Sequence, residues 1–121
     1  MLAGTHPAAL WRSDDAGASW RRLDCRFAES CIYIGRPRVT QVLFDPFEPG
    51  VLWAGAEIDG VYRSGDGGAT WERRSAGLVS DDIHGLVVVR DGGARRIFAA
   101  TNKGLHVSED EGRSWAFQEL D

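Results

Sequence analysis

The stretch that decides the fold is Ser64-Gly65-Asp66-Gly67-Gly68-Ala69-Thr70-Trp71, because the chain repeats its pattern twice more. The other copies are Ser13-Asp14-Asp15-Ala16-Gly17-Ala18-Ser19-Trp20 and Ser108-Glu109-Asp110-Glu111-Gly112-Arg113-Ser114-Trp115. All three share the pattern Ser-x-Asp-x-Gly-x-Ser/Thr-Trp, whose five fixed positions match by chance about once in a million starts. Such an internal repeat indicates an array of similar supersecondary units.

The residue types in this pattern specify a hairpin turn. Asp accepts hydrogen bonds from backbone N–H groups within a turn, Gly adopts a positive φ, and Ser or Thr adds local side-chain-to-backbone bonds. Trp is the first large residue after the turn and can cover the apolar side of the hairpin. We therefore assign a structural role to the fixed residues Ser13, Asp15, Gly17, Trp20, Ser64, Asp66, Gly68, Trp71, Ser108, Asp110, Gly112 and Trp115.

Short apolar segments flank each turn and predict strands. Two precede each copy, at 2–5 and 10–12, 52–55 and 61–63, and 97–101 and 105–107. Copies two and three have a third one upstream, at 39–44 and 83–89, and a short polar segment follows each Trp, at 21–23, 72–74 and 116–120. Four short antiparallel strands joined by tight turns form a propeller blade.

The predicted fold class is therefore all-β, a partial β-propeller with two complete four-stranded antiparallel blades and a three-stranded first blade. The chain is expected to form a single propeller segment of 121 residues. Its parts are blade 1 at 1–23, a connecting loop at 24–38, blade 2 at 39–74 and blade 3 at 83–121.

The three turns and their flanking strands resemble the BNR or Asp-box repeat family. That family includes sialidases, sortilin-type receptors, xyloglucan-acting glycosidases and photosystem II assembly factors. The resemblance covers nearly the whole chain and implies the blade, but not a function, because these relatives share only the scaffold. A sialidase would require an arginine cluster and a tyrosine–glutamate pair spread over six blades, and the Arg-Ile-Pro element typical of sialidases is absent.

The spacing of the turns nominates one face for binding. Ser13 and Ser64 are 51 residues apart, Ser64 and Ser108 only 44, and the extra seven residues fall in the loop 24–38. The three repeated turns, at 13–20, 64–71 and 108–115, are called the Asp-box turns. Insertions in repeat proteins often map to the binding face, which here is the face opposite these turns. The candidate binding residues expected on that face are His6, Arg26, Tyr33, Arg36, Glu57, Asp59, Asn102 and Lys103.

No catalytic residue is assigned from the sequence. The carboxylates of Asp15, Asp66 and Asp110 occupy the same turn position in each copy, which favours a structural role. Glu57 and Asp59 are spaced like a pair of glycosidase carboxylates, but acidic residues are also common in exposed turns. The chain alone is therefore not expected to be an enzyme, whereas a longer parent protein that is a glycoside hydrolase remains an alternative.

Composition and charge narrow the partners. The net charge of −4, from 14 basic and 18 acidic residues, argues against nucleic-acid binding, and no apolar run reaches the roughly 18 residues of a membrane span. Cys25 and Cys31 have only Asp24 and Glu29 beside them, so neither a metal site nor a cofactor is expected. A disulfide between the two cysteines and two free thiols are both compatible with the sequence, which also gives no compartment.

Three blades cannot close a ring, since propellers have four to eight. The sequence is compatible with a fragment of a longer propeller, a protomer that self-associates, or a decayed reading frame. The leading hypothesis is a non-catalytic propeller segment whose parent binds a protein or a glycan. The alternatives are part of a sialidase-like or other glycoside hydrolase, and an assembly factor or scaffold.

Overall fold

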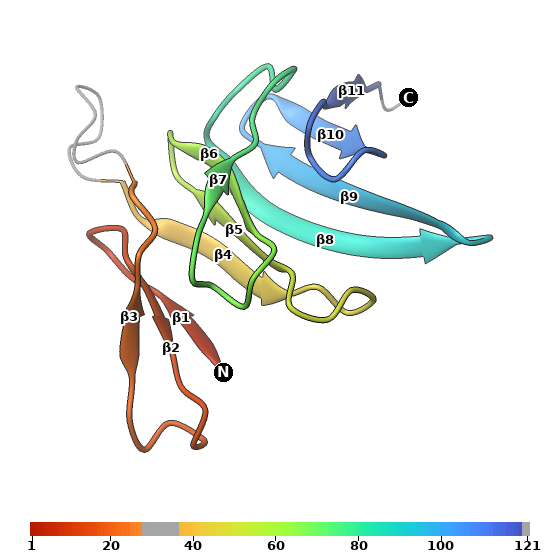
Figure 1. Ribbon diagram of the computed structural model, residues 1–121. Helices are drawn as coiled ribbons and strands as arrows, with labels where there is room; N and C mark the ends of the chain where they lie inside the picture. Colours follow the sequence, from red (N-terminus) through yellow and green to blue (C-terminus); the bar gives the residue numbers. More distant parts are fainter. Residues whose placement is uncertain (28–36, 120–121) are drawn as a thin grey trace.

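The computed structural model describes residues 1–27 and 37–119, which form three antiparallel sheets (Figure 1). Blade 1 contains β1 (Leu2–Gly4), β2 (Leu10–Arg12) and β3 (Arg21–Leu23). Blade 2 contains β4 (Val39–Phe44), β5 (Leu52–Ala56), β6 (Gly60–Ser64) and β7 (Glu72–Arg73). Blade 3 contains β8 (Ile83–Asp91), β9 (Ala94–Thr101), β10 (Gly104–Ser108) and β11 (Ala116–Gln118). The predicted all-β partial propeller with blades of three, four and four strands is confirmed.

Each sheet is an up-and-down meander, so successive turns alternate between two faces of the segment. In blade 2 the strand order is β4-β5-β6-β7, with Trp53 opposite Arg63 and Tyr62 opposite Arg73. The β4–β5 and β6–β7 turns therefore lie on one face, which carries the Asp-box turns. The β5–β6 turn and the connection from β7 to β8 lie on the opposite face.

The β8–β9 hairpin is longer than the sequence predicted. β8 extends to Asp91 and β9 starts at Ala94, joined by Gly92 and Gly93 with φ of 57° and 90°. Two consecutive positive φ values match a tight hairpin turn that only glycine adopts without strain. Because this turn is so short, the strands pair over their full length from Ile83 to Asp91.

The hydrophobic core lies between blades rather than within them. One buried cluster joins blades 2 and 3 and contains Trp53, Val61, Ile83, Leu86 and Trp115 among others. A second cluster joins blades 1 and 2 and contains Leu10, Leu23, Cys25, Ala54 and Tyr62. Each blade thus buries its apolar residues only against a neighbouring blade.

Two glycines, one in β1 and one in the matching strand β5, set the distance between neighbouring blades. A Cβ on Gly4 of β1 would lie 2.3 Å from Cγ1 of Val39, at the start of β4. A Cβ on Gly55 of β5 would lie 2.5 Å from Cγ2 of Ile83, at the start of β8. The hydroxyl of Thr40 ties the second junction, donating to the carbonyl oxygens of Ile83 at 2.5 Å and Gly55 at 3.2 Å. The absence of a side chain therefore lets the innermost strand of each next blade approach.

Candidate functional site

The three Asp-box turns have the same internal hydrogen bonds. In blade 2, Oδ1 of Asp66 accepts from the Ser64 hydroxyl at 2.8 Å and from the Thr70 N–H at 2.9 Å, and Oδ2 accepts from the Thr70 hydroxyl at 2.5 Å. The Ser64 oxygen in turn accepts from the N–H of Gly68 at 2.9 Å. Equivalent bonds occur around Asp15 and around Asp110.

These bonds explain the acidity of the three carboxyl groups. The hydroxyl and backbone N–H of the following Ser or Thr, and then the first Ser, lower the pKa of Asp15, Asp66 and Asp110 to about 2. A carboxylate whose lone pairs are occupied within its own turn is a poor proton donor at neutral pH. The geometry supports a role for these groups in shaping the turn.

The Asp-box tryptophans pack against the preceding blade. The indole N–H of Trp115 donates to the Arg74 carbonyl of blade 2 at 2.9 Å, and this side chain is 6% exposed. Trp71 packs against the cluster between blades 1 and 2, whereas Trp20 is 40% exposed. The same motif residue therefore differs in burial because the described residues contain no blade before blade 1.

The opposite face carries most of the candidate binding residues, each with its own partner. Glu57 accepts a hydrogen bond from Nε of Arg38 at 2.9 Å, and its side chain remains 21% exposed. Asp59 is buried and accepts from the Tyr62 hydroxyl at 2.8 Å. Glu57 and Asp59 thus contact different partners.

The remaining candidates are spread over this face and beyond it. Asn102 accepts from the Ser80 hydroxyl at 2.6 Å, the backbone N–H of Lys103 donates to Thr101, and His6 is exposed. Tyr33 and Arg36 lie outside the described residues.

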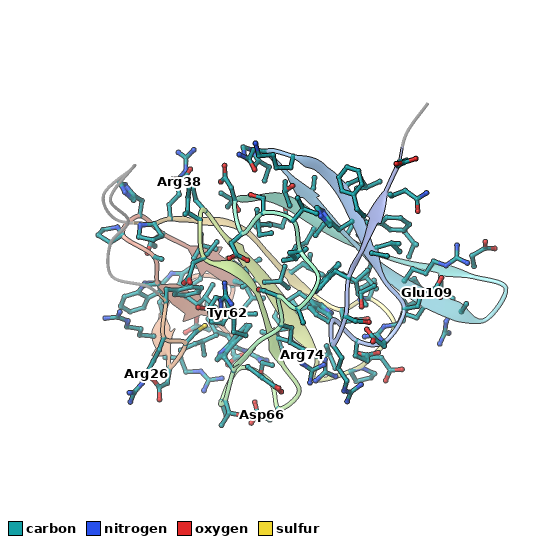
Figure 2. The ribbon with its side chains drawn as sticks, turned by 90° about the horizontal axis from the view of Figure 1, so that it is seen from above. Arg26, Arg38, Tyr62, Asp66, Arg74 and Glu109 are labelled. Carbon is teal, nitrogen blue, oxygen red and sulfur yellow. The ribbon has the colours of Figure 1, made fainter. Side chains whose placement is uncertain are left out.

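Three residues that the sequence did not nominate lie close to the candidates. Arg38 precedes β4, and Asp82 and His84 flank the first residue of β8, so all three lie at the ends of innermost strands on the face opposite the Asp boxes. Figure 2 shows Arg38 and the Asp-box residue Asp66 at opposite edges of the molecule. His84 Nε2 is 3.2 Å from Oδ2 of Asp82, whose Oδ1 is buried without a hydrogen-bond partner among the described residues.

The position of these three residues relative to the innermost strand is the sequence feature that could have identified them. Residues that flank the start of an innermost strand lie at one end of a propeller's central channel. The turns, which differ between copies, do not reveal these positions at the ends of strands. The candidate site at this face therefore combines Arg38, Glu57, Asp82, His84 and Asn102, a set of acceptors and donors suited to hydroxyl groups.

Arg26 lies apart from this set. It lines an open pocket of about 420 Å³ together with Asp24, Tyr62, Ala69, Thr70, Trp71 and Arg73, and so neighbours the Asp-box turn of blade 2. In Figure 2, Arg26 and Arg38 extend from different corners of the molecule. The structure consequently does not bring Arg26 together with Glu57 and Asn102.

Cys25 is buried beside the same pocket, in the cluster between blades 1 and 2. Burial first, and then the carboxylates of Asp59 and Asp24, raise the pKa of its thiol to about 12. Such a thiol is a weak nucleophile. Cys31 lies outside the described residues, so the choice between a disulfide and two free thiols stays open.

Within residues 1–27 and 37–119, no group of three or more His, Cys, Asp or Glu side chains gathers as metal ligands would. The same residues contain no helix long and apolar enough to cross a membrane.

Comparison with known proteins finds similarity to xyloglucan-acting enzymes. No family model matches the sequence. The chain is 26% identical over 114 residues to the oligoxyloglucan-reducing end-specific xyloglucanase of Emericella nidulans, a match covering 89% of this chain and 14% of the relative. It is 38% identical over 85 residues to a xyloglucanase of a Paenibacillus species, covering 64% of this chain and 7% of the relative.

Solved structures give the same result. The GH74 xyloglucanase of Xanthomonas campestris superposes with a TM-score of 0.61 at 28% identity, covering 91% of this chain and 19% of that enzyme. An ancestral GH74 enzyme superposes with a TM-score of 0.59 at 30% identity, covering 65% and 10%. The chain thus spans less than a fifth of these relatives. Its sequence and fold are similar to part of a glycoside hydrolase, which favours that alternative over the leading hypothesis from sequence.

Proposed function

We propose that this chain is a propeller segment of a glycoside hydrolase that acts on xyloglucan, with the face opposite the Asp boxes contacting the polysaccharide. The observation that carries the proposal is the similarity, in sequence and in structure, to proteins named as xyloglucanases or GH74 enzymes. The sialidase-like alternative has no comparable support.

The chemistry of the candidate face fits a neutral polysaccharide. A guanidinium, two carboxylates, an imidazole and an amide provide donors and acceptors for sugar hydroxyls, and the Arg38–Glu57 pair is charge-balanced. Glycoside hydrolysis uses two carboxyl groups on either side of the scissile bond. Glu57 is the best placed of the candidates for such a role, because its side chain is partly exposed and stands in a turn on this face.

The segment is proposed to bind substrate and to contribute one of the two carboxylates, that of Glu57. Glu57 and Asp59 contact different partners, and the Asp-box carboxylates are occupied within their own turns. This arrangement supports the part of the sequence-based hypothesis in which the segment alone is a binding unit. The second carboxylate would then come from another part of a longer protein.

Two measurements on the same variants test the proposal. Titration calorimetry with xyloglucan oligosaccharides, and with cello-oligosaccharides for comparison, measures binding by the full chain. Glu57→Gln is expected to weaken binding of the xyloglucan oligosaccharide, whereas Glu109→Gln, in the exposed Asp-box turn of blade 3 (Figure 2), is expected to leave it unchanged. Release of reducing ends by a longer protein containing this segment measures hydrolysis.

Either of two results counts against the proposal. If the wild type, Glu57→Gln and Glu109→Gln bind the oligosaccharide equally well, the face that carries Glu57 is not the binding face. If the chain binds a protein partner and binds no xyloglucan oligosaccharide, the assembly-factor or scaffold alternative is favoured.

A further inference from the structure

The pocket beside Arg26 is separate from the candidate site at the innermost strands. It forms where the chain after β3 crosses the outer edge of blade 2, between Asp24 and Arg26 on one side and Trp71 and Arg73 on the other. Its volume of about 420 Å³ falls within the range of small-molecule sites, about 300–1,000 Å³. Both of its walls belong to blades present in this chain, and a further blade would pack on the sheet faces at the two ends of the segment. The pocket therefore does not lie on a sheet face against which a further blade would pack.

One wall of the pocket is rigid. The indole N–H of Trp71 donates to the Gly68 carbonyl at 2.9 Å, and the Tyr62 hydroxyl donates to Asp59 at 2.8 Å. Nε of Arg73 donates to the Asp59 carbonyl at 2.9 Å, and its Nη2 lies 3.0 Å from Asp81. These contacts fix the aromatic side chains and Arg73 before any ligand arrives, which lowers the entropy cost of binding.

The other wall offers exposed polar groups. The side chains of Arg26 and Asp24 are 91% and 79% exposed, and they form one long ion pair at 3.9 Å. An exposed pair at this distance contributes little to stability, so a ligand can replace it at small cost. The carboxylate of Asp24 and the guanidinium of Arg26 thus line the same pocket as the half-buried side chain of Trp71.

The charges in and around the pocket disfavour an anionic ligand. Arg26 is paired with Asp24, and Arg73 is paired with Asp59 and Asp81. These two guanidinium groups and three carboxylates sum to a net charge of −1, so an anion gains no net attraction there. A sugar ring presents C–H groups that pack on an indole face and hydroxyls that both donate and accept, which matches Trp71 with the Asp24–Arg26 pair.

We propose that this pocket is a second carbohydrate site, which binds one sugar residue of a neutral polysaccharide at the outer edge of blades 1 and 2. Naming that polysaccharide as xyloglucan rests on the proposed function. The site would anchor a long chain away from the innermost-strand face. It should therefore affect the affinity for the polymer more than the affinity for a short oligosaccharide.

Affinity electrophoresis of the full chain in gels containing xyloglucan, mixed-linkage glucan or mannan tests the site. Trp71→Ala is expected to raise the dissociation constant for the bound polymer about tenfold, the equivalent of 1.4 kcal/mol, and Arg26→Ala about threefold. Trp20→Ala and Arg22→Ala are the matched controls, since Trp20 occupies the same Asp-box position in blade 1 and Arg22 is an exposed arginine of β3. Both controls are expected to migrate as the wild type does.

Trp71 also packs against the core. A loss of binding by Trp71→Ala is therefore attributed to the pocket only if the variant unfolds at the same temperature as the wild type. Arg26→Ala and Asp24→Asn alter exposed side chains and test the site even where Trp71→Ala fails to fold. Unchanged retardation of both exposed-residue variants in every polymer that retards the wild type overturns the inference. So does the absence of retardation in all three gels.

The gels also separate this inference from the proposed function. If Glu57→Gln weakens xyloglucan binding but the pocket variants do not, the proposed function stands and the second site does not. If the pocket variants lose binding to mannan or mixed-linkage glucan, and xyloglucan does not retard the migration of the wild type, the second site stands and the proposed function fails.

Discussion

Arg95 of β9 binds the buried carboxylate of Asp45 across the interface between blades 2 and 3, with its Nη2 2.5 Å from Oδ2. The Asp45 side chain has no exposed surface and also accepts from the Trp53 indole N–H at 3.0 Å and from the Phe47 N–H at 2.9 Å. Arg95 also contacts Glu111 in the Asp box of blade 3. Burial alone would raise the pKa of Asp45, but the hydrogen bonds from Arg95, Trp53 and Phe47 outweigh it and leave this pKa below its ordinary value.

Removing Arg95 is expected to destabilise the protein strongly, because it leaves a charge buried without its ion-pair partner. Breaking a buried pair in this way typically costs about 3–5 kcal/mol. We therefore expect Arg95→Ala to lower the free energy of unfolding by an amount in this range, measured by urea denaturation. Arg90→Ala, which removes an exposed arginine near the Phe47 ring, should cost about 0.5–1 kcal/mol. Equal losses from both variants would show that the Asp45–Arg95 pair is no stronger than a surface contact.

Gly55→Ala tests the close approach of β5 and β8. A methyl group at this position would overlap Ile83, and overpacking of this kind costs about 1–3 kcal/mol. Gly85→Ala is the matched control, because no atom lies within 4 Å of where its Cβ would be. Thermal denaturation should show a lower midpoint for Gly55→Ala only. A midpoint that falls equally in both variants would assign the effect to backbone conformation and not to contact between blades.

The Asp-box carboxylates predict a loss of stability in acid. Their pKa is about 2 in the folded protein, below the roughly 3.9 of an unfolded aspartate. A group whose folded pKa is depressed stabilises the fold above its unfolded pKa, and this contribution disappears as the pH falls from about 4 to about 2. The urea midpoint should therefore decrease over this interval.

Asp66→Asn should reduce the steepness of that decrease, with Asp91→Asn in the exposed β8–β9 turn as the control for losing one carboxylate. An identical pH profile for the wild type and Asp66→Asn would contradict the assignment of the low pKa to the turn.

His106 predicts a second, milder pH dependence nearer neutrality. Its ring is fully buried, Nε2 accepts from the Val79 N–H at 3.1 Å, and the Phe117 ring lies edge-on at 5.2 Å. Burial lowers the pKa of His106, and the carbonyls of Gly104 and Ala99 offset this only in part. The neutral ring therefore stabilises the fold above the unfolded pKa of roughly 6.5, and stability declines as the pH falls below that value.

The decline should be measurable as a lower urea midpoint at about pH 5.5 than at about pH 7.5. His106→Tyr, which installs the residue found at the equivalent position of blade 2, should remove it. His84→Gln, at an exposed histidine, should not. A pH dependence that persists in His106→Tyr and vanishes in His84→Gln would move the effect to the other histidine.

The strands could be predicted from the sequence because their determinants are local. A turn pattern repeated around Trp20, Trp71 and Trp115, with apolar segments at matching distances, is enough to give eleven strands in three sheets. The Asp45–Arg95 pair joins residues 50 positions apart that belong to no shared motif. It depends on how two blades pack, which the pattern within one blade does not specify.

The candidate site shows the same division. Glu57 and Asn102 were nominated because their turns lie on the face opposite the Asp-box turns, where the seven-residue insertion falls. Asp82 was not nominated because its place in the candidate site depends on the innermost position of β8. Arg26 lies beside Trp71 and Arg73, away from Glu57, because its position depends on a connection that is not repeated. Tyr33 and Arg36, in that same connection, remain predictions.

The two hydrophobic clusters have a consequence for how such segments grow. Three blades share two cores here, because each core forms only where two blades meet. An open row always has one core fewer than it has blades, whereas a closed ring has as many cores as blades. The last blade to be added therefore brings two cores at once, so stability should rise in a step at closure rather than in proportion to chain length.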